Sequence, residues 1–81
     1  MKKLLFFTAT WCSACKAIKP IVSKEAPEAG YELRFIDMET DEGIDMAEDF
    51  SIKSLPTLIV IENDKEVKRA IGNTAWAEIQ K

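Results

Sequence analysis

The sequence has no histidine and only two cysteines, Cys12 and Cys15. A structural zinc site takes four ligands, mainly cysteine and histidine, so we expect no metal in a single chain. A disulfide stabilises a fold mainly by closing a long loop, and a bridge across a C-x-x-C spacing closes almost none. These two absences argue against a zinc module and a disulfide framework, and they favour a reducing compartment.

The sequence also lacks a long apolar run. No segment approaches the roughly 20 residues that a membrane-spanning helix needs, so we expect no membrane association. The chain opens with Met-Lys-Lys and continues with the apolar residues 4–7, but a signal peptide needs an apolar stretch of about 7–15 residues. Cleavage after Ala9 would also leave both cysteines almost at the new N-terminus. We therefore expect a cytoplasmic protein.

The length and net charge of the chain further limit what kind of protein it can be. The 81 residues suffice for one domain, residues 1–81, with a modest core. The net charge of −3 argues against nucleic acid as a partner, and nothing in the sequence requires more than a monomer.

Acidic and basic residues are placed unevenly along the chain. Residues 1–24 contain five lysines and no acid, namely Lys2, Lys3, Lys16, Lys19 and Lys24. Residues 37–49 contain seven acids and no base, namely Asp37, Glu39, Asp41, Glu42, Asp45, Glu48 and Asp49. This pattern fits two solvated faces. It also fits a site that benefits from positive potential, because both cysteines lie in the basic part.

Apolar periodicity and turn residues predict the secondary structure. We expect strands at residues 3–8, Tyr31–Asp37, 57–61 and 66–71, and helices at residues 10–24, 43–49 and 74–81. Pro20 should kink the first helix, because proline lacks an N–H and crowds the preceding turn. Pro27 and Gly30 should end that segment, and Thr74 should cap the last helix.

The order of these elements is β-α-β-α-β-β-α. The first two strands, joined through a helix, should be parallel with a right-handed crossover. The last two, joined by a turn at residues 63–65, should form an antiparallel hairpin. The sequence therefore predicts an α/β fold with a four-stranded mixed sheet and helices on both faces.

The cysteine pair lies at the start of the first predicted helix. Side chains three residues apart on a helix are neighbours, so the two sulfurs can reach bonding distance. The first backbone N–H groups of a helix have no intrahelical partner, and they stabilise a thiolate placed there. Lys16 and Lys19 can add to this effect. We expect Cys12 to be the exposed attacking thiol and Cys15, one turn further in, to be the more buried resolving thiol. Two inert core cysteines are the alternative.

Three segments resemble the thioredoxin family. Residues 10–16, Thr-Trp-Cys-Ser-Ala-Cys-Lys, are similar to the family's W-C-G-P-C-K segment except at the central pair. Pro20 falls where thioredoxins carry a helix-kinking proline, eight residues after the first cysteine. Residues 50–57, Phe-Ser-Ile-Lys-Ser-Leu-Pro-Thr, look like the family's aromatic-x-I-x-x-I-P-T segment. The resemblance implies the thioredoxin fold and runs from the first strand to the last helix.

The resemblance also implies a substrate-binding surface. Pro56 corresponds to the family's cis-proline, which faces the cysteine pair, and Leu55 before it offers its backbone to an extended substrate. Trp11 corresponds to a flat apolar wall beside the nucleophile, and Gly72 to a glycine that lets the substrate chain approach. The alternatives are a half-buried core aromatic for Trp11 and a plain turn glycine for Gly72.

The sequence departs from the family in several places. It lacks the extra N-terminal strand and helix of thioredoxins, so we expect a minimal form, nearer in outline to glutaredoxins. Ser13 and Ala14 replace the usual Gly-Pro pair, which tunes the reduction potential. Phe6 stands where the family has a buried aspartate that assists proton transfer. Asp37, at the family's lysine position, is our candidate for part of that role; a solvated carboxylate is the alternative.

The resemblance implies a disulfide reductase that needs no bound cofactor. Its substrates would be disulfide-containing proteins, and its electrons would come from a thioredoxin-reductase-like enzyme or from glutathione. A glutaredoxin-like, glutathione-coupled reductase is the second interpretation, although the usual C-P-Y-C motif and paired glycine are absent. A non-catalytic binding subunit with the same fold is the third.

Overall fold

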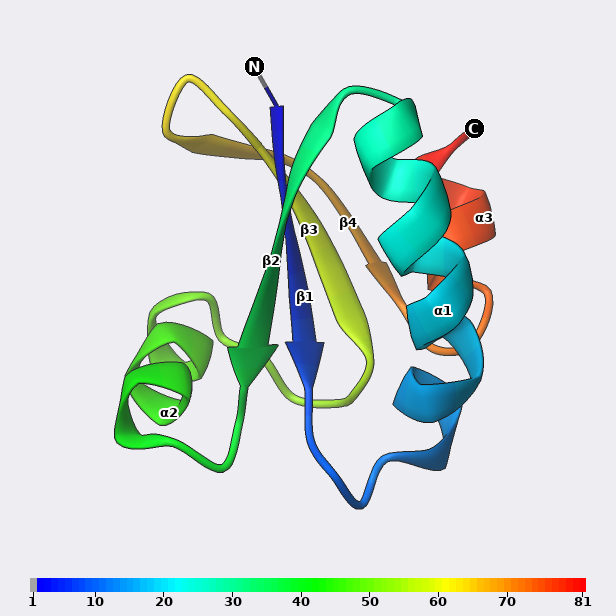
Figure 1. Cartoon of the computed structure of the whole chain (residues 1–81). Coiled ribbons are helices and arrows are strands. Elements are labelled where there is room, and N and C mark those ends of the chain that lie inside the picture. The colour runs from blue at the N-terminus through cyan, green and yellow to red at the C-terminus, as the bar shows by residue number, and fades with distance from the viewer. Residues whose placement is uncertain (1) are drawn as a thin grey trace.

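The computed structural model describes residues 2–81 and shows the predicted order of elements (Figure 1). The elements are β1 (Lys2–Thr8), α1 (Ser13–Glu28), β2 (Tyr31–Asp37), α2 (Asp41–Asp49), β3 (Thr57–Glu62), β4 (Lys65–Ile71) and α3 (Ala75–Ile79).

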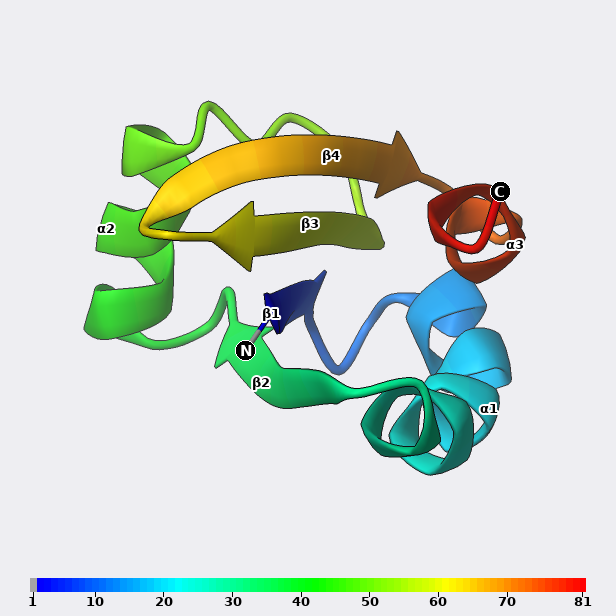
Figure 2. The same cartoon turned by 90° about the horizontal axis from the view of Figure 1, so that it is seen from above.

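The four strands form one mixed sheet in the order β2-β1-β3-β4. β1 pairs in parallel with β2 and antiparallel with β3, and β3 pairs antiparallel with β4. Figure 2 shows α1 and α3 on one face of the sheet and α2 on the other. The predicted fold class, with its parallel first pair and its C-terminal hairpin, is confirmed.

The central strand β1 is buried on both faces. Leu4 and Phe6 point into the core beneath α1 and α3, and Leu5 and Phe7 point into the core beneath α2. A strand covered on both sides has an uninterrupted apolar sequence, and residues 4–7 have one. β1 therefore fixes where the chain emerges at the end of the sheet, just before the cysteines.

Helix α1 begins at Ser13 rather than at residue 10, and it ends four residues later than its sequence predicts. It continues through Pro27 to Glu28, so both Pro20 and Pro27 lie inside it. Each proline costs the helix one backbone hydrogen bond, but the last turn is closed by Gly30 N–H, which donates to the Pro27 carbonyl at 3.0 Å. Gly30 then ends the segment with a φ of 91°. No helix among residues 2–81 has the length and apolar content needed to cross a membrane.

The bounds of the two shorter helices differ from the predictions. α2 begins at Asp41 rather than at residue 43, because the Thr40 hydroxyl caps it by accepting the Gly43 N–H at 3.0 Å. Thr74 occupies the N-cap position of α3, as predicted, but its hydroxyl makes no capping hydrogen bond to the backbone. It donates instead to the Glu78 carboxylate at 3.2 Å, and α3 is a short helix that ends at Ile79 rather than at Lys81.

Helices α1 and α3 are tied to each other across the same face of the sheet. The Trp76 indole is 5% exposed, and its Nε1–H donates to Glu25 Oε1 at 2.8 Å. The Tyr31 ring meets the same indole edge-on, with the ring centroids 6.0 Å apart. A buried indole N–H needs a hydrogen-bond partner, so Glu25 helps to hold α3 against α1.

Gly43 generates a stability prediction, because α2 packs closely on the end of β2. A methyl group at Gly43 would overlap the Asp37 backbone carbonyl and lie 3.0 Å from Thr40 Oγ1. Gly43→Ala should therefore lower the free energy of unfolding by about 1–3 kcal/mol, as overpacking generally does. Urea denaturation measures this change.

Glu42→Ala is the matched control, because Glu42 is the exposed preceding residue on the same helix. It should change stability by less than about 0.5 kcal/mol. Equal stability of the Gly43→Ala variant and the parent protein would contradict the prediction.

Candidate active site

Cys12 and Cys15 form a disulfide at the N-terminus of α1, with their Cα atoms 5.3 Å apart. Cys12 occupies the N-cap position with extended backbone, and its Sγ accepts a hydrogen bond from the Cys15 N–H at 3.1 Å. The predicted position of the pair at a helix start is confirmed. In the reduced protein the same N–H and the helix dipole favour a thiolate on Cys12.

The two cysteines are less accessible than the sequence suggests. Cys12 is 6% exposed and Cys15 is 1% exposed. The predicted order of burial is right, but the expectation of an exposed Cys12 is wrong for the disulfide form. Both side chains belong to the core cluster beneath α1, and Ala14 and Leu55 pack against this cluster. Only a small part of the Cys12 surface therefore remains accessible from solvent.

The loop before β3 contributes Leu55 and Pro56 to this region. The Leu55–Pro56 peptide bond is cis, as the resemblance to thioredoxins implies. The Pro56 carbonyl accepts the Gly72 N–H at 2.9 Å, and Gly72 has a φ of 93°, which favours glycine. The structure thus joins Pro56 and Gly72, far apart in the sequence, at one end of the sheet.

Trp11 lies on the surface next to Cys12. Its side chain is 70% exposed, so the alternative of a core aromatic is wrong. Together with Leu55 it lines a shallow hollow of about 200 Å³, whose other lining residues are Met38, Ile52, Lys53 and Ser54. Trp11 and Leu55 therefore share one apolar surface beside the disulfide.

Asp37 lies at the end of β2, and its carboxylate accepts the Glu39 N–H at 2.8 Å. It lines a hollow with Lys16 and Lys19, and neither cysteine lines that hollow. Phe6, at the position of the family's buried acid, is fully buried. Within residues 2–81, no hydrogen bond joins Asp37 to either cysteine, and its proton-transfer role stays a prediction.

A contact between Glu39 and Thr10, which the sequence does not predict, also belongs to this site. Glu39 Oε1 accepts hydrogen bonds from both the backbone N–H and the hydroxyl of Thr10, each at 2.7 Å. Thr10 directly precedes Trp11 and Cys12, so Glu39 holds the cysteine loop against the loop after β2. Glu39 lies in an acidic run that resembles a solvated face, and no local pattern predicts a bond across 29 residues.

These features define a class of protein. A C-x-x-C disulfide lies at the start of a helix, and the residue before a cis-proline packs against the core cluster that contains both cysteines. A four-stranded mixed sheet with helices on both faces supports them. Among residues 2–81, no three side chains of the metal-binding types lie together. The arrangement is that of a dithiol protein with the thioredoxin fold.

Comparisons with known proteins identify the family. The sequence model of the family Thioredoxin matches residues 1–81, and the chain belongs to this family. A thioredoxin of Mycoplasma genitalium is 42% identical over 66 residues, which are 82% of this chain and 64% of that protein. A bifunctional thioredoxin reductase/thioredoxin of Mycobacterium leprae is 35% identical over 69 residues, which are 85% of this chain and 15% of that protein.

A solved structure gives the same result for the fold. The reduced Schistosoma mansoni thioredoxin pre-protein superposes with a TM-score of 0.87 at 26% identity, over 98% of this chain and 72% of that one. The chain spans less than two thirds of the length of the curated relatives given above.

The Glu39–Thr10 contact generates a prediction about pH. The hydrogen bonds from Thr10, the backbone N–H first and then the hydroxyl, lower the pKa of Glu39 from its ordinary value of 4.5. A lowered folded-state pKa means that the carboxylate stabilises the fold above pH 4.5, and that this contribution is lost as the pH falls through the lowered pKa. The stability difference between the parent protein and Glu39→Gln should therefore shrink below pH 4.5.

Two variants separate the charge of Glu39 from its hydrogen bonds. Glu39→Gln keeps a carbonyl oxygen that can accept both bonds, whereas Glu39→Ala removes them. Hydrogen exchange of the Thr10 amide should therefore be faster in Glu39→Ala than in Glu39→Gln. Equal exchange rates in the two variants, or a stability difference independent of pH, would show that this contact does not hold the loop.

Proposed function

We propose that this protein is a thiol–disulfide oxidoreductase that reduces disulfides in other proteins. The observation that carries the proposal is the Cys12–Cys15 disulfide at the N-terminus of α1, beside the cis Leu55–Pro56 bond. Membership of the thioredoxin family supports it. We also propose that residues 1–81 form a single domain.

The reaction needs two exchanges and no bound cofactor. The Cys12 thiolate attacks one sulfur of the substrate disulfide, forming a mixed disulfide and expelling the first substrate thiolate. The Cys15 thiolate then attacks Cys12 Sγ, which expels the second substrate thiolate and leaves the Cys12–Cys15 disulfide. Two electrons pass to the substrate, and a donor must return two electrons and two protons. The Cys15 N–H, which donates to Cys12 Sγ, stabilises a Cys12 thiolate and so favours Cys12 as the attacking group.

The substrate would lie across the surface formed by Trp11, Leu55, Pro56 and Gly72. Trp11 and Leu55 line one apolar hollow, and the Gly72 N–H already donates to the Pro56 carbonyl. Pro56 has no N–H, and the backbone of Leu55 remains to bind an extended chain. This surface favours an unfolded or loop segment of a protein over a compact small disulfide.

The proposed electron donor is a thioredoxin-reductase-like enzyme. The Mycobacterium leprae relative combines a thioredoxin reductase and a thioredoxin in one protein, which supports this donor over glutathione. We further propose that the protein acts as a monomer in a reducing, cytoplasmic compartment. Its only cysteines are the pair at the site, so it has no structural disulfide that would require an oxidising compartment.

Asp37 remains our candidate for assisting proton transfer at the dithiol. It lies at the end of β2 and shares a hollow with Lys16, the residue after Cys15. An Asp37→Asn variant should then reduce disulfides more slowly than the parent protein, with a changed pH profile between pH 6 and 9. An unchanged rate across that range would leave Asp37 as a solvated carboxylate.

Serine variants test the proposed roles of the two cysteines. Cys12→Ser should abolish reduction of a disulfide-bonded protein such as insulin, because the attacking thiolate is lost. Cys15→Ser should accumulate a mixed disulfide at Cys12, because the resolving thiolate is lost. Turbidity and intact mass measure these two outcomes.

The double variant Cys12→Ser, Cys15→Ser distinguishes a binding subunit from an enzyme. A non-catalytic subunit would support the same process with both cysteines removed. A mixed disulfide that accumulates on Cys15 in the Cys12→Ser variant would reverse the two proposed roles.

The reduction potential separates the two candidate reductases. The protein is equilibrated in thiol buffers of graded potential, and its fluorescence reports the fraction reduced. A thioredoxin-like reductase should have a reduction potential of about −270 mV. A potential of about −200 to −230 mV would favour the glutaredoxin-like interpretation and glutathione as the donor. The absence of any reversible two-electron transition would contradict the redox function altogether.

A further inference from the structure

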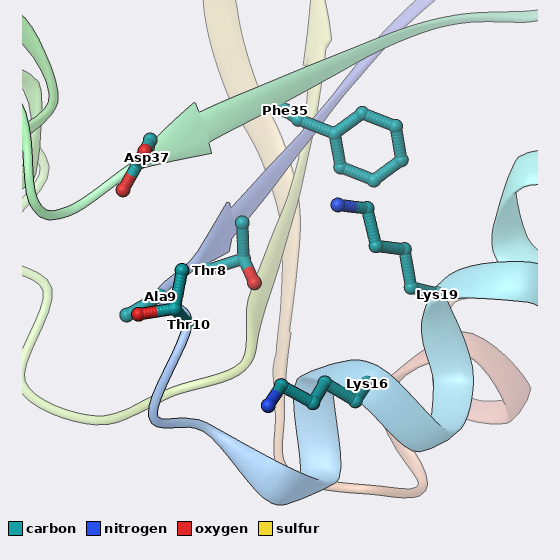
Figure 3. A pocket seen from close by; sticks show the side chains of 7 residues that line it. All are labelled: Thr8, Ala9, Thr10, Lys16, Lys19, Phe35 and Asp37. Carbon is teal, nitrogen blue, oxygen red and sulfur yellow. The ribbon is translucent and has the colours of Figure 1, made fainter.

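A second hollow, which we call the lysine hollow, lies between α1 and the ends of β1 and β2 (Figure 3). Its volume is about 340 Å³, and it is lined by Thr8, Ala9, Thr10, Lys16, Lys19, Phe35 and Asp37. Neither cysteine lines it, and it shares no lining residue with the hollow beside Trp11. The proposed redox function gives Asp37 a role but assigns none to the hollow as a whole.

Two positive charges form one wall of the lysine hollow. Lys16 and Lys19 are three residues apart on α1, so they lie on the same side of the helix. Figure 3 shows both side chains extending from α1 toward Thr8. The two ion pairs among residues 2–81 join Arg34 to Glu32 and Arg69 to Glu66, so neither lysine is paired with a carboxylate in the described part of the chain.

An aromatic ring forms a second, apolar wall. Phe35 is 41% exposed, yet its ring is held in place because it packs on the buried Phe6 ring, with centroids 5.3 Å apart. The Lys19 ammonium lies 4.7 Å from the centroid of the Phe35 ring, a favourable cation–π contact. A cation and an accessible aromatic surface thus meet in one hollow.

Asp37 provides the opposite charge on the far side of the hollow. In Figure 3 its carboxylate lies across from the two ammonium groups, at the end of β2. A ligand with a second anionic group at that end would meet electrostatic repulsion. A ligand with a single anionic group, directed to α1, would not.

We propose that the lysine hollow binds a small organic molecule with one anionic group and one flat apolar face. The anionic group lies between the Lys16 and Lys19 ammonium groups, and the flat face lies against the Phe35 ring. The volume of about 340 Å³ lies at the lower end of the range for small-molecule sites, about 300–1,000 Å³. An aromatic carboxylate fits this description.

Benzoate is the direct probe of this site, and two relatives of benzoate are its controls. Benzamide keeps the ring and removes the charge, whereas acetate keeps the charge and removes the ring. Titration into ¹⁵N-labelled protein should shift the amide signals of Thr8, Lys19 and Phe35 with benzoate, with a dissociation constant on the order of 1 mM. Benzamide and acetate should each bind at least about fivefold more weakly.

Matched lysine variants locate the binding to the hollow. The double variant Lys16→Gln, Lys19→Gln should bind benzoate about tenfold more weakly, because both ammonium groups are lost. Lys24→Gln removes an exposed lysine from the same helix outside the hollow, so it should bind like the parent protein. The dispersed amide spectrum recorded in each titration shows that each variant is folded.

Several results would overturn the proposal. No saturable benzoate shifts, equal binding of benzamide or acetate, or unchanged affinity in the double lysine variant would each do so. Shifts centred on Trp11 instead of Phe35 would assign the binding to the other hollow. The same titration of the Cys12→Ser, Cys15→Ser variant should give the same affinity, so the outcome is independent of the proposed redox function.

Discussion

The burial of β1 on both faces is the constraint on which the rest of this structure depends. Leu4 and Phe6 belong to one core and Leu5 and Phe7 to the other, so a shift of one residue would exchange the two sets. β1 pairs with β2 in parallel and with β3 antiparallel. The register of β1 therefore also sets where β2 ends and β3 begins relative to the cysteine loop. The chain leaves β1 and reaches the disulfide within four residues of Thr8.

Two long-range contacts hold the loops around the disulfide. Glu39 binds both donors of Thr10 on one side, and Gly72 donates to the Pro56 carbonyl on the other. Each contact joins a loop of the site to the end of a different strand. The cysteine loop and the cis-proline loop are thus each held to the sheet by a separate contact.

The strands and the site motifs could be predicted from the sequence, because both depend on patterns of residues that are close together in the chain. β2 has the predicted bounds because Tyr31, Leu33 and Phe35 alternate with charged residues directly after Gly30. The cis bond at Pro56 is implied by the family resemblance, since the physical prior for an X-Pro bond is only about 5–6%. The burial of Cys12 and the Glu39–Thr10 contact depend on how distant segments pack, which no short-range pattern records.

The two tryptophans occupy opposite extremes of solvent exposure. Trp11 is 70% exposed beside the disulfide, whereas Trp76 is 5% exposed and bonded to Glu25. The molecule therefore contains two fluorophores in very different surroundings. An aqueous collisional quencher reaches the first far more readily than the second, so the emission that survives quenching reports the α1–α3 core, and the emission that is lost reports the surface next to the sulfurs.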